Sequence, residues 1–342
     1  MSSPVRRNRS PSGRPHVGVL FTCIGRRIEL ADAFRRAAAK LNVRLTLHGA
    51  DMTWFAPALH HVDRAHIVPA LSDSNYLDAL VEIIRKNRID LAIPLIDSEL
   101  MLMSEAWERL DAIGCRVVIS SEEVIRRCQD KLLTFEVLKK AGIDTPKTWS
   151  YREALRRKRH RFPYMVKPRE GSAGQGNFKV DHLAELKVLG RRVCDPIVQE
   201  FVEGWEHTLD VYTGLDGIAR CVVPRRRLEV RSGEVSKGMV VKDPRIMAVG
   251  RRVATALGDC RGVVTVQCMV TPDQRIRVIE INPRFGGGVP LAINAGADFP
   301  KWLMAQHLGR RVRINPTGFK DKITMLRYDQ SVFCSLNEHE AF

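Results

Sequence analysis

The sequence lacks three features that would each have assigned it to a class of proteins. It has no apolar run long enough to cross a membrane, no Cys-x-x-Cys pair and no internal repeat. A membrane-spanning helix needs about 18 or more apolar residues in succession, so no span is expected. Without a Cys-x-x-Cys pair there is no zinc-ribbon or thioredoxin motif, and the eight scattered cysteines are interpreted as reduced thiols of a cytoplasmic protein.

The amino-terminal end also lacks the apolar segment of a secretory signal. Its first fifteen residues, MSSPVRRNRSPSGRP, are basic and rich in Ser and Pro. A secretory signal needs an apolar core of about 7–15 residues, so export is not expected. Residues 1–14 are predicted to form a disordered basic arm.

Acidic residues are scarce relative to basic ones. The 342 residues include 55 Lys and Arg against 39 Asp and Glu, which gives a net charge of +16. This balance predicts an anionic partner, such as a nucleotide, a phosphorylated metabolite, nucleic acid or an acidic membrane. Four arginines of the arm and six basic residues between 152 and 161 carry much of the excess. Because no helix-turn-helix, zinc-finger or aromatic-basic sheet signature accompanies it, no nucleic-acid partner is expected.

The first third of the chain alternates strand and helix patterns. The apolar run 16–24 predicts a buried parallel strand, and 28–41 predicts an amphipathic helix after it. Further strands are predicted at 44–51, 65–70, 90–96 and 115–120, with helices at 76–88 and 100–114. Alternation of this kind predicts an α/β fold with an open parallel sheet, assigned to residues 15–120.

The rest of the chain has a different pattern of predicted elements, with hairpins and shorter helices. Hairpins are predicted over 208–230 and 262–284, the second turning at Pro272-Asp273-Gln274. Helices are predicted over 121–142 with a break near Asp130, and over the basic stretch 151–162. Further helices are predicted at 182–192, 243–258 and 299–309, with strands at 163–169, 178–180 and 196–202.

A glycine-rich loop follows the strand that contains Lys167. The loop, EGSAGQGN over 170–177, offers the backbone amides of Ser172, Gly174 and Gly176 to a polyphosphate, while Lys167 supplies fixed positive charge. No Gly-Lys-Ser/Thr ends the loop, and strand rather than helix follows, so it is neither a Walker A loop nor a dinucleotide-binding fingerprint. An ordinary glycine-rich hairpin is the alternative.

Three oxygen-donor side chains share one face of the hairpin over 262–284. Glu280 and Asn282 alternate along the return strand, and the turn brings Gln267 of the first strand to the same face. Oxygen ligands of this kind suit Mg²⁺. Arg284 falls on the same face, where it can neutralise a transferring phosphoryl group. A polar edge hairpin is the alternative, but apolar neighbours such as Ile279 and Ile281 favour a half-buried strand.

Taken together, these motifs resemble the ATP-grasp superfamily, and most closely the ATP-grasp unit of carbamoyl-phosphate-synthase large chains and their stand-alone relatives. The resemblance covers about residues 16–325. It implies a pre-ATP-grasp domain at 15–120, a two-lobed α+β ATP-grasp domain at 121–328 with a mobile lobe at about 147–199, and a tail at 329–342.

The resemblance also implies roles for individual residues. Lys131 and Lys167 would contact the nucleotide phosphates, Glu200 and Val202 would meet the adenine edge, and Glu206 would bind the ribose. The metal ligands it implies are Gln267, Glu280 and Asn282, binding Mg²⁺ or alternatively Mn²⁺, with Arg284 at the phosphoryl group.

The acceptor site is expected near the amino-terminal strand ends and the glycine run 286–288. Arg26, at a strand-to-helix turn, suits a carboxylate or a phosphate. Structural pairing of Arg26 and Arg27 with Asp51 or with 97–99 is the alternative. Gly287 would allow close backbone approach. The segment 224–238 resembles a closing loop, whose Arg226 and Lys237 would touch phosphate or the substrate carboxylate; a solvated basic loop is the alternative.

The function implied is that of an ADP-forming ligase of carboxylates and amines, acting through an acyl phosphate, with ATP and Mg²⁺ as cofactors. Its partners would be small molecules, and the sequence does not determine whether the protein forms a homodimer. Two alternatives are phosphorylation of bicarbonate or carbamate, as in carbamoyl-phosphate synthesis, and a non-enzymatic basic protein that binds nucleic acid.

Overall fold

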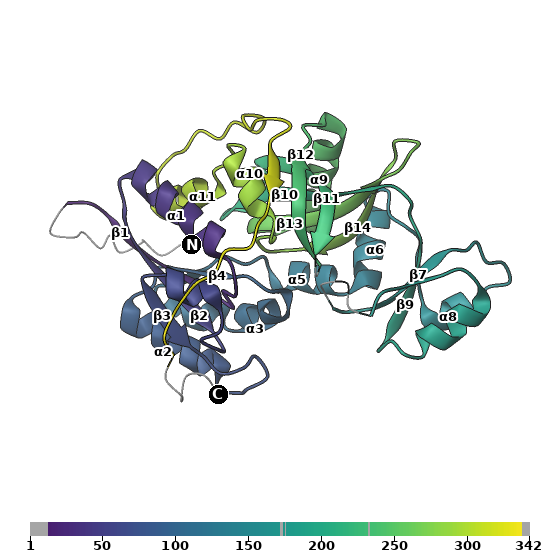
Figure 1. Ribbon diagram of the computed structural model, residues 1–342, viewed down its shortest axis with the longest axis horizontal. Helices are drawn as coiled ribbons and strands as arrows, with labels where there is room; N and C mark the ends of the chain where they lie inside the picture. The colour runs from purple at the N-terminus through teal and green to yellow at the C-terminus, as the bar shows by residue number, and fades with distance from the viewer. Residues whose placement is uncertain (1–12, 172–173, 175, 232, 337–342) are drawn as a thin grey trace.

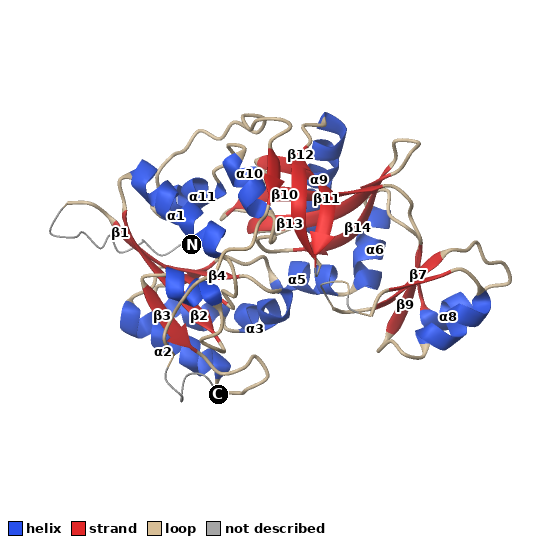
Figure 2. Ribbon diagram, viewed as in Figure 1, coloured by secondary structure: helices blue, strands red, loops and turns tan. Residues whose placement is uncertain are grey.

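The protein is built around three β-sheets, which follow one another along the chain. The computed structural model describes residues 13–171, 174, 176–231 and 233–336. Most of the arm to Arg14, Ser172 of the glycine-rich stretch and the end of the tail, 337–342, therefore lie outside the described residues. In Figure 1 the first sheet lies at the left, the largest in the centre and the smallest at the right. Figure 2 shows helices packed against all three.

The amino-terminal domain is an open parallel sheet with the strand order β3-β2-β1-β4-β5. The order reverses between β1 and β4, and ligands of such sheets bind beyond the carboxyl ends of the strands at this point. Its strands are β1 (His16–Thr22), β2 (Arg44–Asp51), β3 (Arg64–Ile67), β4 (Leu91–Pro94) and β5 (Arg116–Val117). Its helices are α1 (Ile28–Leu41), α2 (Tyr76–Asn87), α3 (Leu100–Glu105) and α4 (Trp107–Ala112), with 3₁₀ turns at Pro57–His61 and Asp97–Glu99.

The central body is an antiparallel sheet with the order β14-β13-β10-β11-β12-β15. Its strands are β10 (Trp205–Gly214), β11 (Cys221–Arg231), β12 (Glu234–Val240), β13 (Gly262–Val270), β14 (Ile276–Asn282) and β15 (Thr324–Leu326). The helices around it are α5 (Glu122–Gln129), α6 (Lys131–Lys140), α9 (Pro244–Leu257), α10 (Val289–Asn294) and α11 (Phe299–His307). The sheet provides most of the polar side chains described below.

A small lobe projects from the body. Its antiparallel sheet has the order β6-β9-β7-β8, formed by β6 (Thr148–Ser150), β7 (Tyr164–Pro168), β8 (Phe178–Val180) and β9 (Pro196–Glu200). The helices α7 (Tyr151–Leu155) and α8 (Leu183–Gly190) pack on this sheet. The predicted fold class is confirmed: a parallel α/β domain precedes a two-lobed part built on antiparallel sheets.

The lobe has a hydrophobic core of its own, whereas the largest cluster is shared between the other two parts. The core of the lobe gathers residues such as Tyr164, Val166 and Leu186. In contrast, one cluster runs from the amino-terminal domain into the body, where the ring of Phe34 in α1 meets that of Phe285 at 6.4 Å between centroids. Burial of apolar surface thus ties the first domain to the body more firmly than to the lobe.

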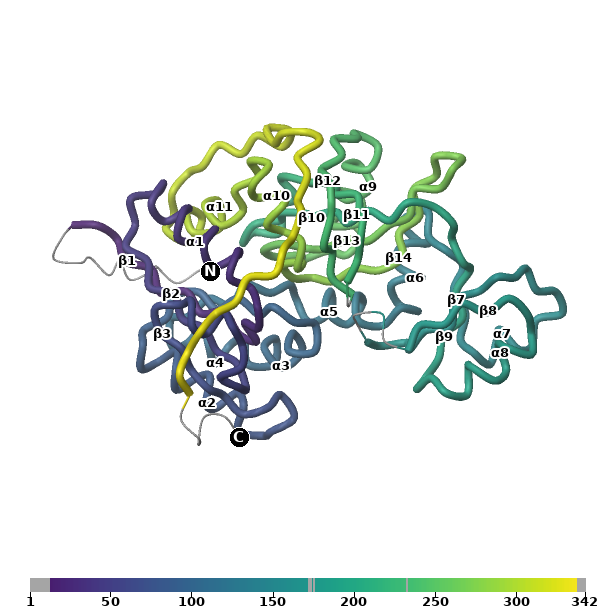
Figure 3. The backbone as a smooth tube through the Cα atoms, viewed as in Figure 1, coloured from purple at the N-terminus to yellow at the C-terminus, as the bar shows by residue number. Residues whose placement is uncertain are grey.

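The end of the chain returns to the amino-terminal domain. The guanidinium of Arg327 contacts the Glu29 carboxylate of α1 at 3.1 Å. Figure 3 shows this last segment, in yellow, passing over the first domain. Among the described residues, no helix combines the length and the apolar character that crossing a membrane requires.

Two sequence predictions of local structure were wrong. The basic helix expected over 151–162 ends at Leu155. Four consecutive cations follow, which would repel one another on a helix, and Pro163 disfavours helical residues before it. The expected closing loop over 224–238 is instead mainly the paired strands β11 and β12 of the central sheet.

Candidate active site

A cavity of about 790 Å³ lies where the three parts of the protein meet. The amino-terminal domain contributes residues that follow β1 and β4, the two strands at which its order reverses. The lobe contributes β7, β9 and the glycine-rich loop, and the body contributes one face of its sheet. Because the walls come from all three parts, the cavity exists only in the assembled chain.

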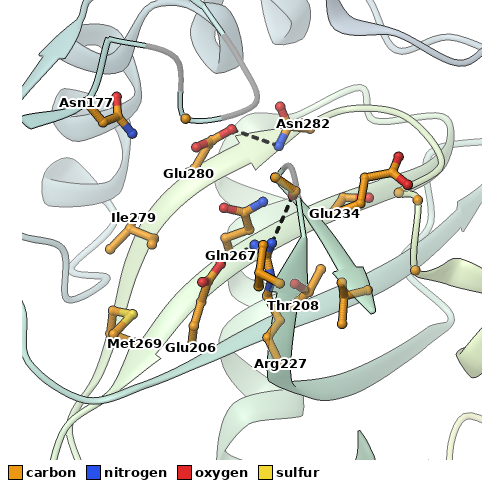
Figure 4. Close-up of a pocket in the computed structure, with 18 of the residues that line it drawn as sticks. Asn177, Glu206, Thr208, Arg227, Glu234, Gln267, Met269, Ile279, Glu280 and Asn282 are labelled. Atoms are coloured by element: carbon orange, nitrogen blue, oxygen red, sulfur yellow. Dashed lines mark hydrogen bonds and ion pairs between the residues drawn. The ribbon is translucent and has the colours of Figure 1, made fainter. Parts of the chain in front are cut away.

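The predicted metal ligands lie together on the wall formed by β13 and β14. Gln267 and Glu280 are directly paired across the two strands, and the Asn282 amide Nδ2 donates to Glu280 Oε1 at 3.1 Å (Figure 4). This bond uses the amide nitrogen of Asn282 and leaves its oxygen for a cation. Oxygen donors from one carboxylate and two amides fit Mg²⁺, which prefers hard oxygen ligands.

Lys167 faces this wall from the lobe. Its ammonium is buried and donates to Gln199 Oε1 at 2.9 Å, while the Gln199 amide donates to Thr148 Oγ1 at 3.0 Å. Burial lowers the pKa of Lys167, and the charge of Glu280 opposes that shift. Among the described residues, Gln199 Oε1 is the one acceptor of this buried ammonium, and it is neutral, so an anionic ligand would stabilise the charge.

The glycine-rich loop is tied to the start of α6. Arg169 donates from Nε and Nη2 to Asp130 Oδ2 at 2.9 and 2.6 Å, and Asp130 also caps α6. Lys131 follows the cap, and its ammonium donates to the Gly171 carbonyl at 3.0 Å. Gly174 lines the cavity, whereas Lys131 and Gly176 lie outside its lining. Burial lowers the pKa of Lys131, and the charge of Glu280 opposes that shift, as it does for Lys167.

The segment from Glu200 to Gly204 joins the lobe to the body along the cavity. Glu200 and Val202, which the resemblance places at the adenine edge, both line the cavity. The Glu200 carboxylate itself is engaged, because it accepts from Arg277 Nη2 at 2.8 Å. Gly204 has φ +157°, and a Cβ there would lie 2.4 Å from the Val270 carbonyl, so this position requires glycine.

Glu206 also lies in the cavity, with its carboxylate paired to Arg227 at 2.5 Å. Arg227 in turn donates to the Gly233 carbonyl at 3.0 Å, between β11 and β12. Figure 4 shows Glu206, Thr208 and Gln267 on adjacent strands of one sheet face. The predicted ribose ligand is therefore present, but one of its oxygens already has a cationic partner.

Arg284, predicted at the phosphoryl group, is held by the amino-terminal domain. Its Nε lies 3.0 Å from Asp97 Oδ2, and its Nη1 donates to the Phe285 carbonyl at 3.2 Å. Both side chains of the Arg284–Asp97 pair are largely buried, and both line the cavity. Asp97 follows β4, one of the two strands between which the order of the parallel sheet reverses. This end of the sheet therefore holds Arg284 in position.

A second contact between domains lies at the glycine run. Arg27, not the predicted Arg26, lines the cavity, and its Nη1 is 3.1 Å from Glu234 Oε1. Arg26 is more exposed and meets the same carboxylate at 3.3 Å. A Cβ at Gly287 would lie 2.4 Å from Arg27 Nη1 and 2.7 Å from Glu234 Oε1. Glycine at 287 therefore lets this ion pair reach the backbone.

Neither Arg26 nor Arg27 pairs with the acids at the strand ends of its own domain. Asp51 accepts the backbone amide of Gly25 at 2.8 Å. Glu99 is buried and accepts from the hydroxyls of Tyr76 and Thr22 at 2.6 and 2.8 Å. The structural pairing weighed for these arginines does occur, but with Glu234 of the body.

The basic run on β11 faces two ways. Arg225 and Arg227 line the cavity, whereas the predicted Arg226 lies on the opposite face, 5.1 Å from the centre of the Trp205 ring. Lys237 is also outside the lining, and its ammonium pairs with Glu229 at 2.7 Å. Strand alternation separates Arg226 from its neighbours, but only the pairing of Thr208 with Arg225 shows which face is inside.

Arg225 is fully buried and was not singled out from the sequence. It donates from Nε and Nη2 to the two Asp210 oxygens at 2.5 and 2.9 Å. A Cβ at Gly288 would lie 2.3 Å from Arg225 Nη1, which explains the third glycine of the run. The pair therefore places a buried ionic contact in the wall of the cavity, with Arg225 in the lining.

Comparison with known proteins agrees with this architecture. Residues 128–288 match the family model of the ATP-grasp domain, and residues 19–118 match the PylC-like N-terminal domain. The carbamoyl phosphate synthase large chain of Thermotoga sp. (strain RQ2) is 26% identical over an alignment of 257 residues, and the match covers 66% of this chain and 23% of that protein. This chain thus spans about a quarter of the length of such relatives.

Two solved structures share the fold. The L-amino acid ligase from Bacillus licheniformis has a TM-score of 0.66 at 20% identity, over 85% of this chain and 74% of that chain. The biotin carboxylase from Campylobacter jejuni has a TM-score of 0.70 at 16% identity, over 89% and 73%. By the family models, the chain contains an ATP-grasp domain over residues 128–288, preceded by a PylC-like N-terminal domain over residues 19–118.

Proposed function

We propose that this protein is an ATP-dependent ligase that joins a carboxylate to an amine. The carboxylate oxygen attacks the γ-phosphorus of ATP, which forms an acyl phosphate and releases ADP. The amine nitrogen then attacks the acyl carbon, phosphate leaves with the bonding electrons, and loss of the amine proton gives the amide. The observation that carries the proposal is the oxygen-donor set on β13 and β14, which faces the buried Lys167 across one cavity.

Gln267, Glu280 and Asn282 would hold the metal ion. When bound, Mg²⁺ would neutralise phosphate charge. Lys167, with Gln199 fixing its ammonium, would bind phosphates from the lobe, and Lys131 with the amides around Gly174 and Gly176 would support them. The work of these residues is to position the reactants and to offset charge.

The adenosine would lie along the segment 200–206, with Val202 beside the base and Glu206 at the ribose. Cation pairing of Glu206 with Arg227 leaves its second oxygen for a hydroxyl. Since the lobe has a separate hydrophobic core, it can close on the nucleotide as a unit without disrupting the body.

The acceptor would bind at the far end of the cavity, between Arg284 and Gly287. Arg27 and Arg284 supply positive charge there, and each is balanced by a carboxylate, Glu234 or Asp97. An anionic substrate would share these arginines with their partners. Arg26 lies at the rim, where it can guide an anion inward, whereas Arg226 and Lys237 would need to move to reach it.

The relationship to carbamoyl phosphate synthase large chains supports a second candidate, with bicarbonate as the phosphorylated carboxylate. In that case bicarbonate alone would stimulate ATP turnover. An organic carboxylate with an amine would be required under the main proposal.

The test is a screen for ADP and phosphate release with Mg-ATP over carboxylates crossed with amines, followed by mass spectrometry of the products. We expect ADP and an amide, with turnover reduced at least about 100-fold in Lys167→Ala and Glu280→Ala. Lys187→Ala, an exposed lysine of α8 on the same lobe, is the matched control and should retain activity. Release of AMP and pyrophosphate, or wild-type turnover in either active-site variant, would contradict the proposal.

A further inference from the structure

A second cavity, of about 400 Å³, lies on the other side of the segment that follows β9. Glu200 and Phe201 line both this cavity and the main one. The remaining lining comes from the lobe and its connection, Lys147, Arg161, Phe162 and Pro163, and from the β13–β14 hairpin, Arg275 and Arg277. The cavity therefore spans the junction between the lobe and the body.

The lining is strongly basic. Its four cationic side chains face one carboxylate, that of Glu200, which leaves a net charge of +3 among the lining residues. Asp144 lies beside the cavity and lowers the local excess to +2, since it pairs with Arg275 at 2.8 Å and Arg277 at 3.3 Å. The acids near the cavity are thus already committed to the two arginines of the body.

The two cations from the lobe side have no such partner. Neither Lys147 nor Arg161 forms a salt bridge within the described part of the chain, and both side chains are exposed to solvent. The backbone holds their positions: Glu200 N donates to the Lys147 carbonyl at 2.9 Å, and Arg161 N donates to the Tyr164 hydroxyl at 2.8 Å. Two cationic side chains without an ion-pair partner in the described part of the chain thus extend from anchored backbone positions at the same cavity.

We propose that this second cavity is a binding site for a small multivalent anion of the phosphate class, which bridges the lobe to the body. Arg161 would form paired hydrogen bonds to phosphate oxygens, and Lys147 would add a point charge. Arg277, of which 14% is exposed, would reach the anion from the opposite wall while Glu200 still holds it. The inference does not rest on the proposed ligase activity, because none of these cations lines the main cavity.

The experiment measures pyrophosphate binding to the full chain by calorimetry, without nucleotide or Mg²⁺ and at constant ionic strength adjusted with NaCl. Lys147→Gln/Arg161→Gln should weaken binding at least about tenfold, a loss of about 1.4 kcal/mol. The control Arg152→Gln/Arg156→Gln removes the same charge from exposed positions of the lobe outside the cavity and should change binding less than about twofold. Thermal unfolding verifies that both variants are folded.

Lys167→Met separates the two cavities. Pyrophosphate bound in the second cavity should be insensitive to this change, whereas pyrophosphate in the nucleotide site should be lost. The inference is overturned if wild type does not bind pyrophosphate, if the control pair weakens binding as much as the cavity pair, or if Lys167→Met alone abolishes binding.

Discussion

The guanidinium of Arg284 lies 3.0 Å, from Nε to Oδ2, from the carboxylate of Asp97, although the two residues are 187 positions apart. Arg284 follows β14 of the body, and Asp97 follows β4 of the amino-terminal domain. The other oxygen of Asp97, Oδ1, is buried without a hydrogen-bond partner among the described residues. Burying an acceptor without a hydrogen bond costs free energy, so Asp97 itself is not in a favourable site. We infer that the contact holds the guanidinium of Arg284 in position.

Asp97→Asn should therefore reduce kcat of the proposed ligase by at least about tenfold, because Arg284 would lose its charged partner and its fixed position. The KM for ATP should change little, since Asp97 lies away from the expected adenosine site. Steady-state kinetics check this split. Asp78→Asn removes the same charge from an exposed ion pair with Arg109 and is the matched control. Equal kcat values for Asp97→Asn and Asp78→Asn would refute the role of Asp97 in positioning Arg284.

Gln267→Glu should strengthen metal binding. The substitution adds a second carboxylate directly opposite Glu280, so the two charges repel without metal and are both neutralised with it. We expect the Mg²⁺ concentration for half-maximal ATP turnover to fall by about fivefold or more, and the unfolding temperature without Mg²⁺ to fall as well. Titrations of activity and of thermal unfolding with Mg²⁺ provide the two readouts. A Mg²⁺ requirement that rises, or stays the same, would remove Gln267 from the metal site.

The buried pair of Asp210 and Arg225 should dominate the stability of the central sheet. Asp210→Asn leaves the Arg225 charge without a carboxylate in a site where both side chains are almost fully buried. Loss of one partner of such a pair costs about 3–5 kcal/mol of the free energy of unfolding. Glu122→Gln, in an exposed pair with Arg126, should cost less than about 1 kcal/mol. Urea unfolding measures the free energy of unfolding of both variants. Similar losses would show that the buried pair contributes no more to stability than the exposed one.

Glu99 should make the amino-terminal domain less stable as the pH rises. Burial raises the pKa of this carboxyl to about 7 from its ordinary value of 4.5. Because the folded state favours the neutral acid, its stabilising contribution is complete below about pH 4.5 and is lost as the pH rises through about 7. Glu99→Gln should remove that dependence.

The measurement is urea unfolding of wild type and Glu99→Gln at several pH values from 5 to about 8. The difference between the two proteins isolates Glu99, because His48, whose pKa burial lowers to about 4, contributes with the opposite sign in both. A difference that does not vary with pH, or that moves in favour of wild type at high pH, would contradict the assignment.

Much of the candidate site could be predicted from the sequence, because it depends on short-range geometry. Alternation along one strand and a tight turn are enough to bring Gln267, Glu280 and Asn282 to one face, and the register agrees. The lysine before the glycine-rich loop was identified for the same reason, since a strand and its following loop are contiguous in the chain. Their roles toward ATP and Mg²⁺ stay predictions.

The sequence by itself determined the order of the elements and which side chains share one face of the β13–β14 hairpin. Only the tertiary structure decided which charges meet: Asp97 with Arg284, and Arg27 rather than Arg26 with Glu234. Alternation also left undecided which of the arginines 225–227 faces inward until β11 was paired with β10. The physical reason is that ion pairs between domains depend on sheet order and packing, which are set by burial of apolar surface between distant segments, and a linear pattern does not encode that distance.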